Sequence, residues 1–361
     1  MRRDIATLLI LVASTALHAA DFPAPEEGDY ILKDVKFASG ESLPEVRMHY
    51  RTIGQPKRDD GGKVTNAILI LHATSGQSGN FVEGAGKTIF AGELFGAGQP
   101  LDATKYWIII PDSIGHGKSS KPSDEMHAHF PQYVYHDNIE AQHRLLTEGL
   151  KVDHVRLVMG TSMGGMHTWL WGEMYPDFMD ALVPLASLPG PISGRNRMWR
   201  KMISELIRND PEWMNGDYKS QPRGLRSAVE VMYLFSDNPI NRQKQAPTLQ
   251  AADENLARAV NARAGQMDAN DLLYAVESSK DYNPAPDLEK IHAPLLAINF
   301  ADDLINPPEL GILEREVKRV PHGRAIVFPR SDQTVGHGTH TKASVWKSEF
   351  ERFLKENTHF E

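Results

Sequence analysis

A glycine-flanked serine that follows an apolar run constrains this chain more than any other stretch. Residues 160–164 read Gly-Thr-Ser-Met-Gly, directly after an apolar, β-branched run that ends at residue 159, and residues 166–171 have the character of a helix. A strand, a sharp turn and a helix are the setting of a nucleophile elbow. Gly160 and Gly164 are small where strand and helix must pass close together around a strained serine. The pattern therefore predicts that Ser162 is a nucleophile held clear of a sheet.

The rest of the chain alternates apolar runs with amphipathic stretches. Four runs, at residues 67–71, 106–110, 181–186 and 294–300, are typical of strands covered on both faces in a mostly parallel sheet. Helices are expected between the strands, including one over roughly residues 309–320. This alternation predicts an α/β fold, a mostly parallel sheet with helices on both faces.

Residues 188–291 differ in character from the chain on either side. They show helical periodicity, are rich in Met, Trp and Arg, and contain few β-branched runs. We therefore expect a helical lid inserted between two strands, over the carboxyl edge of the sheet. Arg195, Arg197 and Arg200 lie near its start, and each is either a solvated charge on a lid helix or a group that binds an anionic part of a substrate.

The first twenty residues have the pattern of a secretory signal peptide. Arg2 and Arg3 precede an apolar run over residues 5–17, and Ala19 and Ala20 end the segment. A basic start, a short apolar core and small residues are typical of such a peptide, and the run is short for a membrane span. The chain has no cysteine, which fits export to an oxidising compartment. We predict a periplasmic or secreted protein with no membrane association after cleavage.

The expected organisation is a signal peptide and one α/β core interrupted by a lid. The signal peptide covers residues 1–20, the first part of the core residues 21–187, the lid residues 188–291, and the second part of the core residues 292–361. A net charge of −8, without a basic tract rich in aromatic residues, argues against a nucleic-acid partner. The histidines at 127, 129 and 136 have no carboxylates at matching spacing, so no metal site is expected there.

Acidic residues and histidines after the last two core strands complete the set that a serine nucleophile needs. Asp302 and Asp303 follow the run at 294–300, and His337 and His340 follow the last strand. A serine hydroxyl is a weak nucleophile until an imidazole takes its proton, and a carboxylate fixes the imidazole tautomer and stabilises its charged form. The order serine, acid, histidine is that of the α/β-hydrolase fold. Which aspartate and which histidine take part stays open on this pattern.

Two backbone N–H groups are expected to face the oxyanion that such a serine creates. One is the N–H of Met163, the residue after the nucleophile at the start of the next helix. The other belongs to the glycine-containing loop at residues 72–76, which follows the strand at 67–71. Within that loop we expect the donor to be Thr74, with Ala73 as the alternative.

The chain resembles the homoserine O-acetyltransferase family of α/β-hydrolases over nearly all of residues 21–361. Residues 160–166 (Gly-Thr-Ser-Met-Gly-Gly-Met) are similar to that family's elbow, residues 209–218 to its lid signature, residues 303–307 to its acid segment and residues 336–337 to its base segment. By that similarity Asp303 is the acid and His337 is the base.

Two loops depart from the family pattern and favour hydrolysis. Residues 115–119 (Gly-His-Gly-Lys-Ser) look like an esterase loop, and residues 72–76 differ from the family's His-Ala-Leu-Thr-Gly. Acetyl-CoA is also a cytoplasmic metabolite, whereas this chain is predicted to be exported. We therefore expect a hydrolase of small carboxylic esters with an acyl-serine intermediate. The alternatives are an O-acyltransferase of the homoserine type and a non-catalytic binding protein on the same fold. The expected partner is a small ester or acyl molecule, no cofactor is expected, and the choice between monomer and homodimer stays open.

Overall fold

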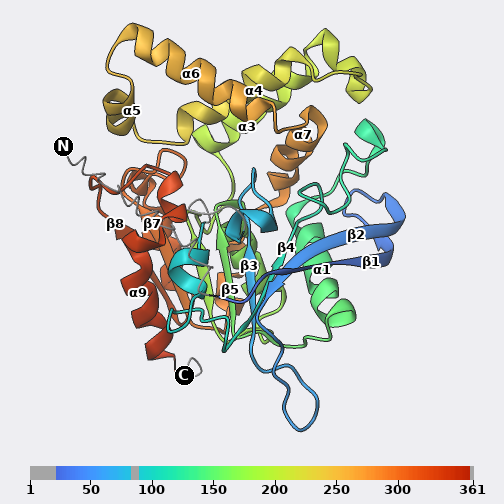
Figure 1. Cartoon of the computed structure of the whole chain (residues 1–361), viewed down its shortest axis with the longest axis vertical. Helices are drawn as coiled ribbons and strands as arrows, with labels where there is room; N and C mark the ends of the chain where they lie inside the picture. The colour runs from blue at the N-terminus through green and yellow to red at the C-terminus, as the bar shows by residue number, and fades with distance from the viewer. Residues whose placement is uncertain (1–21, 83–88, 358–361) are drawn as a thin grey trace, which may run out of the picture.

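A computed structural model of the chain describes residues 22–82 and 89–357, and the predicted signal peptide at 1–20 lies outside these residues. The described residues form an eight-stranded sheet with the strand order β1-β2-β4-β3-β5-β6-β7-β8 (Figure 1). β2 runs antiparallel to β1 and β4, and the pairs from β4 to β8 are parallel. The strands are β1 (Glu26–Lys36), β2 (Ser42–Ile53), β3 (Ala67–Leu71), β4 (Trp107–Pro111), β5 (Leu157–Thr161), β6 (Leu182–Leu185), β7 (Leu295–Phe300) and β8 (Gly323–Phe328).

Helices cover both faces of this sheet and its upper edge in Figure 1. The helices are α1 (Tyr135–Arg144), α2 (Met163–Met174), α3 (Gly194–Arg208), α4 (Arg223–Phe235), α5 (Pro239–Gln245), α6 (Leu249–Ala264), α7 (Ala269–Glu277), α8 (Ile312–Glu316) and α9 (Ala343–Glu356). α1 and α2 pack on one face, α9 packs on the other, and α3 to α7 lie above the strands (Figure 1). The predicted α/β architecture with a mostly parallel sheet is therefore confirmed.

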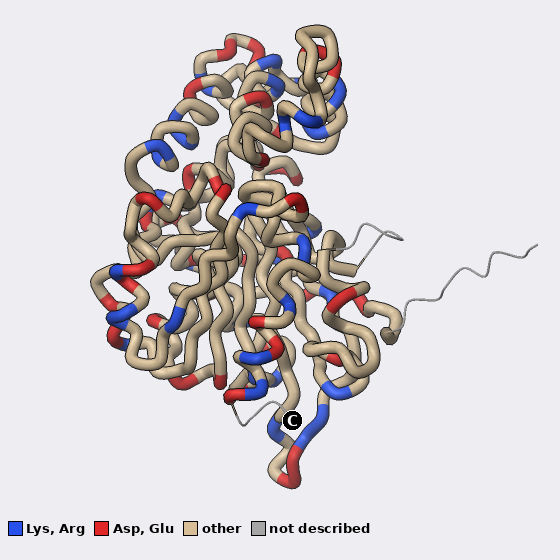
Figure 2. Tube along the Cα trace, turned by 90° about the vertical axis from the view of Figure 1, so that its left-hand side faces the viewer, with Lys and Arg blue, Asp and Glu red and all other residues tan. Residues whose placement is uncertain are grey.

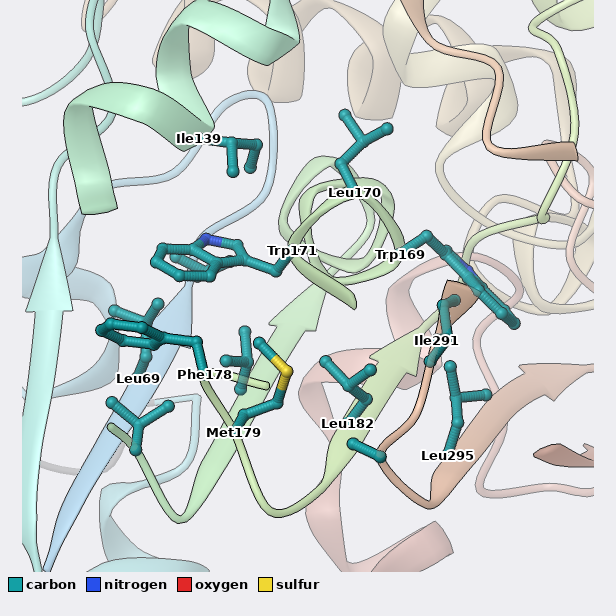
Figure 3. Close-up of a cluster of buried hydrophobic side chains, with 14 of the residues drawn as sticks. Leu69, Ile139, Trp169, Leu170, Trp171, Phe178, Met179, Leu182, Ile291 and Leu295 are labelled. Atoms are coloured by element: carbon teal, nitrogen blue, oxygen red, sulfur yellow. The ribbon is translucent and has the colours of Figure 1, made fainter. Parts of the chain in front are cut away.

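Alternate residues of the central strands supply two hydrophobic cores, one on each face of the sheet. Leu69 of β3 and Leu182 of β6 face α2, where Trp169 and Trp171 fill the space between helix and sheet (Figure 3). Their neighbours on the strands, such as Ile68, face α9 on the opposite side. Side chains of a strand alternate between the two faces, so a strand buried on both faces is apolar throughout. This explains the continuous apolar runs in the sequence.

The segment between β7 and β8 differs from the single helix expected over residues 309–320. A 3₁₀ turn at Pro308–Leu310 is followed by Gly311 at φ 62°, and only then does the short helix α8 begin. A left-handed residue cannot continue an α-helix, and glycine adopts it at little cost. The expectation of one continuous helix was wrong, because this glycine interrupts it.

The helices above the sheet have a hydrophobic cluster of their own. Trp199 and Ile203 of α3 pack against Leu225 of α4, Val260 of α6 and Leu273 of α7. Further along the chain, Leu288 and Ile291 belong instead to the core beneath α2. In the view of Figure 2, the positions of Lys and Arg are interspersed with those of Asp and Glu along the chain trace. Within the residues that the structure describes, no helix is long and apolar enough to span a bilayer.

One partly buried carboxyl group on α2 gives a pH-dependent expectation for stability. Burial raises the pKa of Glu173 on α2 to about 8, and its Oε1 has no hydrogen-bond partner among the described residues. The folded state therefore keeps a proton that the unfolded chain releases above about pH 4.5. Because of this difference, Glu173 lowers the free energy of unfolding as the pH rises from about 4.5 to 8.

Glu173→Gln is expected to reduce this loss of stability. The free energy of unfolding, measured by urea titration at pH 5 and pH 8, should fall less in the variant than in the wild type, by about 1 kcal/mol or more. Glu140→Gln on the exposed face of α1 serves as the control. An identical pH dependence in Glu173→Gln and wild type would show that this carboxyl is ionised in the fold at neutral pH.

Candidate active site

Ser162 lies in a strained turn between β5 and α2. Its backbone has φ 54° and ψ −108°, a conformation that a non-glycine residue rarely adopts. The turn is tight because a Cβ on Gly160 would lie 2.1 Å from the Gly164 carbonyl oxygen, and a Cβ on Gly164 would lie 2.2 Å from the Leu71 carbonyl oxygen. Both glycines are therefore required by close backbone approach, as the sequence pattern indicated.

His337 joins Ser162 to Asp303 in one hydrogen-bonded chain. His337 Nε2 lies 2.8 Å from Ser162 Oγ, and His337 Nδ1 lies 2.8 Å from Asp303 Oδ2. With Nδ1–H donating to the carboxylate, Nε2 is free to accept the serine proton. The three residues lie in the segments that follow β5, β7 and β8, and therefore at the carboxyl ends of these parallel strands.

Backbone groups hold the Asp303 carboxylate in its charged form. Asp303 is only 1% exposed, and its Oδ1 accepts from the N–H groups of Ile305 at 2.7 Å and Asn306 at 3.1 Å. Burial alone raises the pKa of Asp303, but His337 and these two N–H groups outweigh it and hold the pKa below its usual value. Asn306 Nδ2 also donates to Asp303 Oδ2 and to the Ala186 carbonyl. Sequence reasoning did not single out Asn306, although its place three residues after the acid was visible.

The geometry also separates the two candidates for the acid. Asp302 Oδ2 accepts from Asn238 Nδ2 at 2.8 Å, Thr334 Oγ1 at 2.8 Å and the Gly336 N–H at 3.1 Å. It therefore ties the loop that carries His337 to the segment between α4 and α5. Asp303, and not Asp302, contacts the imidazole.

His340 is the histidine that does not contact Ser162. Its ring packs edge to face on the His337 ring, with the ring centres 5.2 Å apart. Burial, and secondly the nearby His337, lower the pKa of His340 to about 3, so it is neutral. It packs on His337 and takes no part in the hydrogen-bonded chain.

The loop after β3 and the first turn of α2 lie on either side of Ser162. Thr74, Ala73 and Ser162 line the same cavity, and Met163 begins α2. The described residues supply no hydrogen-bond acceptor to the N–H of Thr74 or of Met163. Two free N–H groups beside a nucleophile are the elements of an oxyanion hole.

Two buried histidines hold the loop after β3 in place, and sequence reasoning gave them no role. His72 Nδ1 lies 2.9 Å from the Ala73 carbonyl, and its Nε2 accepts from the Ser113 N–H at 3.0 Å. The Ala73 carbonyl and the Thr74 N–H belong to one planar peptide group, so this bond also fixes the direction of the N–H. His116 Nε2 lies 2.9 Å from the Thr74 carbonyl, and burial lowers the pKa of His116 to about 4.

A cavity of about 280 Å³ lies between Ser162 and the helices above it. Its apolar lining comes mainly from Met166, Trp199, Met232, Phe235 and Ile305. Of the three arginines at the start of α3, Arg200 lines this cavity, whereas Arg195 donates to the Leu304 carbonyl and lies over the Phe235 ring. Arg197 is not among the lining residues.

The histidine cluster noted in the sequence does not assemble a metal site. His136 Nδ1 lies 2.6 Å from Asp281 Oδ2, which raises the pKa of His136. Over residues 22–82 and 89–357, no group of three or more His, Asp or Glu side chains is arranged to hold a metal ion.

Comparison with known proteins places this geometry in a family. Residues 66–341 match the model of the α/β-hydrolase fold. The chain belongs to the α/β-hydrolase fold family. A protein of Methanothermobacter thermautotrophicus named "Probable acyltransferase" is 29% identical over 307 residues, which cover 85% of this chain and 90% of that protein. A homoserine O-acetyltransferase of Chlorobaculum parvum is 27% identical over 326 residues, covering 82% of this chain and 85% of the relative.

Solved structures of this family share the same fold. The crystal structure of esterase E22 superposes with a TM-score of 0.81 at 19% identity, covering 91% of this chain and 99% of the esterase. The curated relatives are named as acyltransferases, and the protein is an enzyme of the α/β-hydrolase fold. The resemblance to homoserine O-acetyltransferases that the motifs indicated is confirmed.

Proposed function

We propose that this α/β-hydrolase is an ester hydrolase that forms an acyl enzyme on Ser162, with His337 as the base and Asp303 as the residue that orients it. The observation that carries the proposal is the unbroken hydrogen-bonded chain from Ser162 Oγ through His337 to Asp303. Its position at an elbow serine with φ 54°, between two free backbone N–H groups, fits nucleophilic attack on a carbonyl carbon.

The chemistry follows from the positions of these groups. Ser162 Oγ attacks the ester carbonyl while His337 Nε2 takes its proton, and the carbonyl oxygen becomes an oxyanion facing the N–H groups of Thr74 and Met163. The oxyanion collapses, the bond to the alcohol oxygen breaks, and His337 gives its proton to the departing alkoxide. Water then attacks the acyl-Ser162 carbonyl with His337 again as the base, which releases the carboxylic acid and restores the serine.

An O-acyltransferase is the second candidate. Water and an alcohol attack the same acyl-enzyme, so the two functions differ only in which nucleophile reaches it. Relatives named homoserine O-acetyltransferase favour an alcohol acceptor, whereas the similar fold of esterase E22 and the loop at residues 115–119 favour water.

A paired assay on the purified protein tests the proposal. 4-Nitrophenyl acetate is supplied with and without homoserine, and acetyl-CoA is supplied with homoserine in parallel, with products identified by mass spectrometry. A hydrolase should release acetate steadily at a rate that homoserine does not change. O-acetylhomoserine from acetyl-CoA, with little acetate, would replace the hydrolase by the transferase. Failure of a fluorophosphonate probe to label Ser162 in the folded protein would contradict both.

We also propose that residues 1–20 direct export and are then removed. The support is the basic start, apolar core and terminal alanines of that segment together with the absence of cysteine from the chain. Expression of the full chain in a Gram-negative host, followed by fractionation and N-terminal mass analysis, should find a periplasmic protein that begins near residue 20 or 21. Intact residue 1 in the cytoplasmic fraction would contradict export.

A further inference from the structure

A second cavity adjoins the catalytic cavity beside α2. It has a volume of about 600 Å³, compared with about 280 Å³ for the cavity that contains Ser162. It lies between the segment that leads from β6 to α3 and the segment that leads from β7 to α8. Its lining includes the apolar side chains of Leu188, Pro191, Ile192, Leu304, Leu310 and Ile312. We call it the apolar chamber.

The polar groups of the apolar chamber are either engaged or turned to solvent. Tyr282 is 2% exposed, and its hydroxyl donates to the Leu188 carbonyl at 2.7 Å. The charged lining residues are Arg195 and Glu309, and both are exposed. Charge therefore lies toward the mouth of the chamber, and its inner part is suited to a hydrocarbon group.

Four side chains separate the apolar chamber from the catalytic cavity, since they line both. They are Met166, Asn196, Ile305 and Asn306. Hydrogen bonds hold the two amides in place, because Asn196 Oδ1 accepts from Arg200 Nε at 3.0 Å and Asn306 Nδ2 donates to the Ala186 carbonyl at 2.8 Å. The two asparagines are therefore fixed parts of the wall.

Met166 is the adjustable part of this wall. Ile305 is anchored, since its N–H donates to Asp303 Oδ1 at 2.7 Å and its β-branched side chain has few rotamers. Met166 lies one turn of α2 after Ser162, and its N–H donates to the Ser162 carbonyl at 2.9 Å. Its unbranched thioether side chain has three rotatable bonds and adapts to neighbouring groups. A rotation of this side chain would join the two cavities directly beside the nucleophile.

The other cavity next to the catalytic site differs in chemistry. It has a volume of about 690 Å³, is reached past Thr74 and Arg263, and is also lined by Asp268 and Asp271. A hydrocarbon chain placed there would take water from a guanidinium and two carboxylates, which is costly. The apolar chamber is therefore the favoured place for an apolar part of a substrate.

We propose that the apolar chamber binds the hydrocarbon chain of the substrate, so that the enzyme prefers esters with an unbranched chain of medium length, which extends past Met166. This inference rests on the proposed function and names its substrate class. Each methylene group that leaves water for the chamber should raise kcat/KM by about two- to fourfold. The chain belongs either to the acyl part or to the alcohol part of the ester.

Three esters test the substrate class. Ethyl acetate is the short reference, and ethyl hexanoate and hexyl acetate each add four methylene groups, on the acyl part and on the alcohol part respectively. The two longer esters are isomers, so they match in overall composition. The wild type should hydrolyse at least one of them with a kcat/KM about 10- to 100-fold above that of ethyl acetate. The isomer with the larger kcat/KM identifies the part of the ester that enters the chamber.

Gly190→Met tests the chamber by filling it. Gly190 lines the chamber but not the catalytic cavity, its φ is not left-handed, and a Cβ there would approach Ile312 Cγ2 at 3.4 Å, an ordinary contact. The variant should lower the ratio of kcat/KM for the preferred long ester and ethyl acetate by about tenfold or more, mainly through KM for the long ester. Gly92→Met is the matched control, because Gly92 is exposed and a Cβ there would have no described atom within 4 Å outside its own chain neighbours.

Two substitutions of Met166 test the passage between the cavities. Met166→Ala removes the adjustable part of the wall and should raise the same ratio by about threefold or more, because the chain no longer displaces the thioether. Met166→Ile replaces it by a stiff β-branched side chain and should lower the ratio. Equal ratios in the two variants would contradict a chain that extends past Met166. A thermal melt of each variant shows that the fold is kept.

Equal kcat/KM for the three esters in the wild type would overturn the inference while leaving the proposed hydrolase intact. A ratio that is the same in Gly190→Met and wild type would overturn it too, because the chain would then lie outside the chamber. If no ester is hydrolysed, the proposed function fails, and calorimetric titration of Ser162→Ala with ethyl hexanoate and hexyl acetate tests the chamber itself. Binding that Gly190→Met weakens in this background supports the chamber, whereas unchanged or absent binding contradicts it.

Discussion

Ser162→Ala is expected to lower kcat for 4-nitrophenyl acetate by about 10⁴-fold or more, without loss of the fold. Alanine removes the oxygen that attacks the ester and leaves His337 with no proton to accept. The residual rate should come from substrate binding and the backbone N–H groups of Thr74 and Met163, which the substitution does not remove. The alanine variant also keeps the turn, since only Oγ is lost from a residue whose backbone strain is imposed by the surrounding chain.

The measurement is steady-state hydrolysis together with fluorophosphonate labelling and a circular dichroism melt. A folded variant with more than about a tenth of wild-type kcat would show that another residue is the nucleophile. Ser187→Ala is a suitable control, because Ser187 lines the same cavity and donates nothing to His337. It should change kcat by less than about tenfold.

Asp303→Asn is expected to lower kcat by about 10³- to 10⁴-fold in a protein that still folds. Asp303 Oδ1 accepts two backbone N–H groups, so the amide oxygen of an asparagine takes that place and its NH₂ group faces His337 Nδ1. The NH₂ group donates, which forces Nδ1 to accept and moves the ring proton to Nε2. A protonated Nε2 cannot take the proton of Ser162, so the hydrogen-bonded chain is reversed while its geometry is kept.

Asp302→Asn is the matched comparison, because it makes the same chemical change at the neighbouring residue. Asp302 accepts from Asn238, Thr334 and Gly336 and does not contact the imidazole. The expected result is a lower melting temperature, from about 1–3 kcal/mol of lost hydrogen bonding, with kcat within about tenfold of wild type. Equal losses of kcat in the two variants would contradict the assignment of Asp303 as the orienting acid.

The choice between the two histidines could not be made from the sequence pattern alone. His337 and His340 both follow the last strand, and either could be a base by residue type alone. The distinction depends on a contact with Ser162 that spans 175 residues of sequence, and on a ring packing that puts His340 behind His337. The motif resemblance had favoured His337 and Asp303, and the structure brings those two together with the serine.

Other residues of the site could not be predicted from the spacing of residues in the sequence. His72 and His116 hold the Thr74 peptide through carbonyl contacts, and a histidine in a loop gives no sign of such a role. Arg200 was one of three arginines on a predicted lid helix, and helical periodicity could not decide which of them faces the cavity. The helix expected over residues 309–320 failed for a local reason, since a glycine is tolerated within a helix and only its observed φ of 62° marks the break.

Local patterns in the sequence thus determined where the central strands lie and which residue, Ser162, occupies the turn between a strand and a helix. Continuous apolar runs require strands buried on both faces, and glycines around Ser162 require close passage of a strand and a helix, because both effects act between residues near in sequence. The tertiary structure alone decided the partners: which aspartate meets the imidazole, which peptide groups lie beside Ser162, and which arginine lines the cavity. Those outcomes depend on distances between segments far apart along the chain, which are set by how the helices above the sheet close over its carboxyl edge.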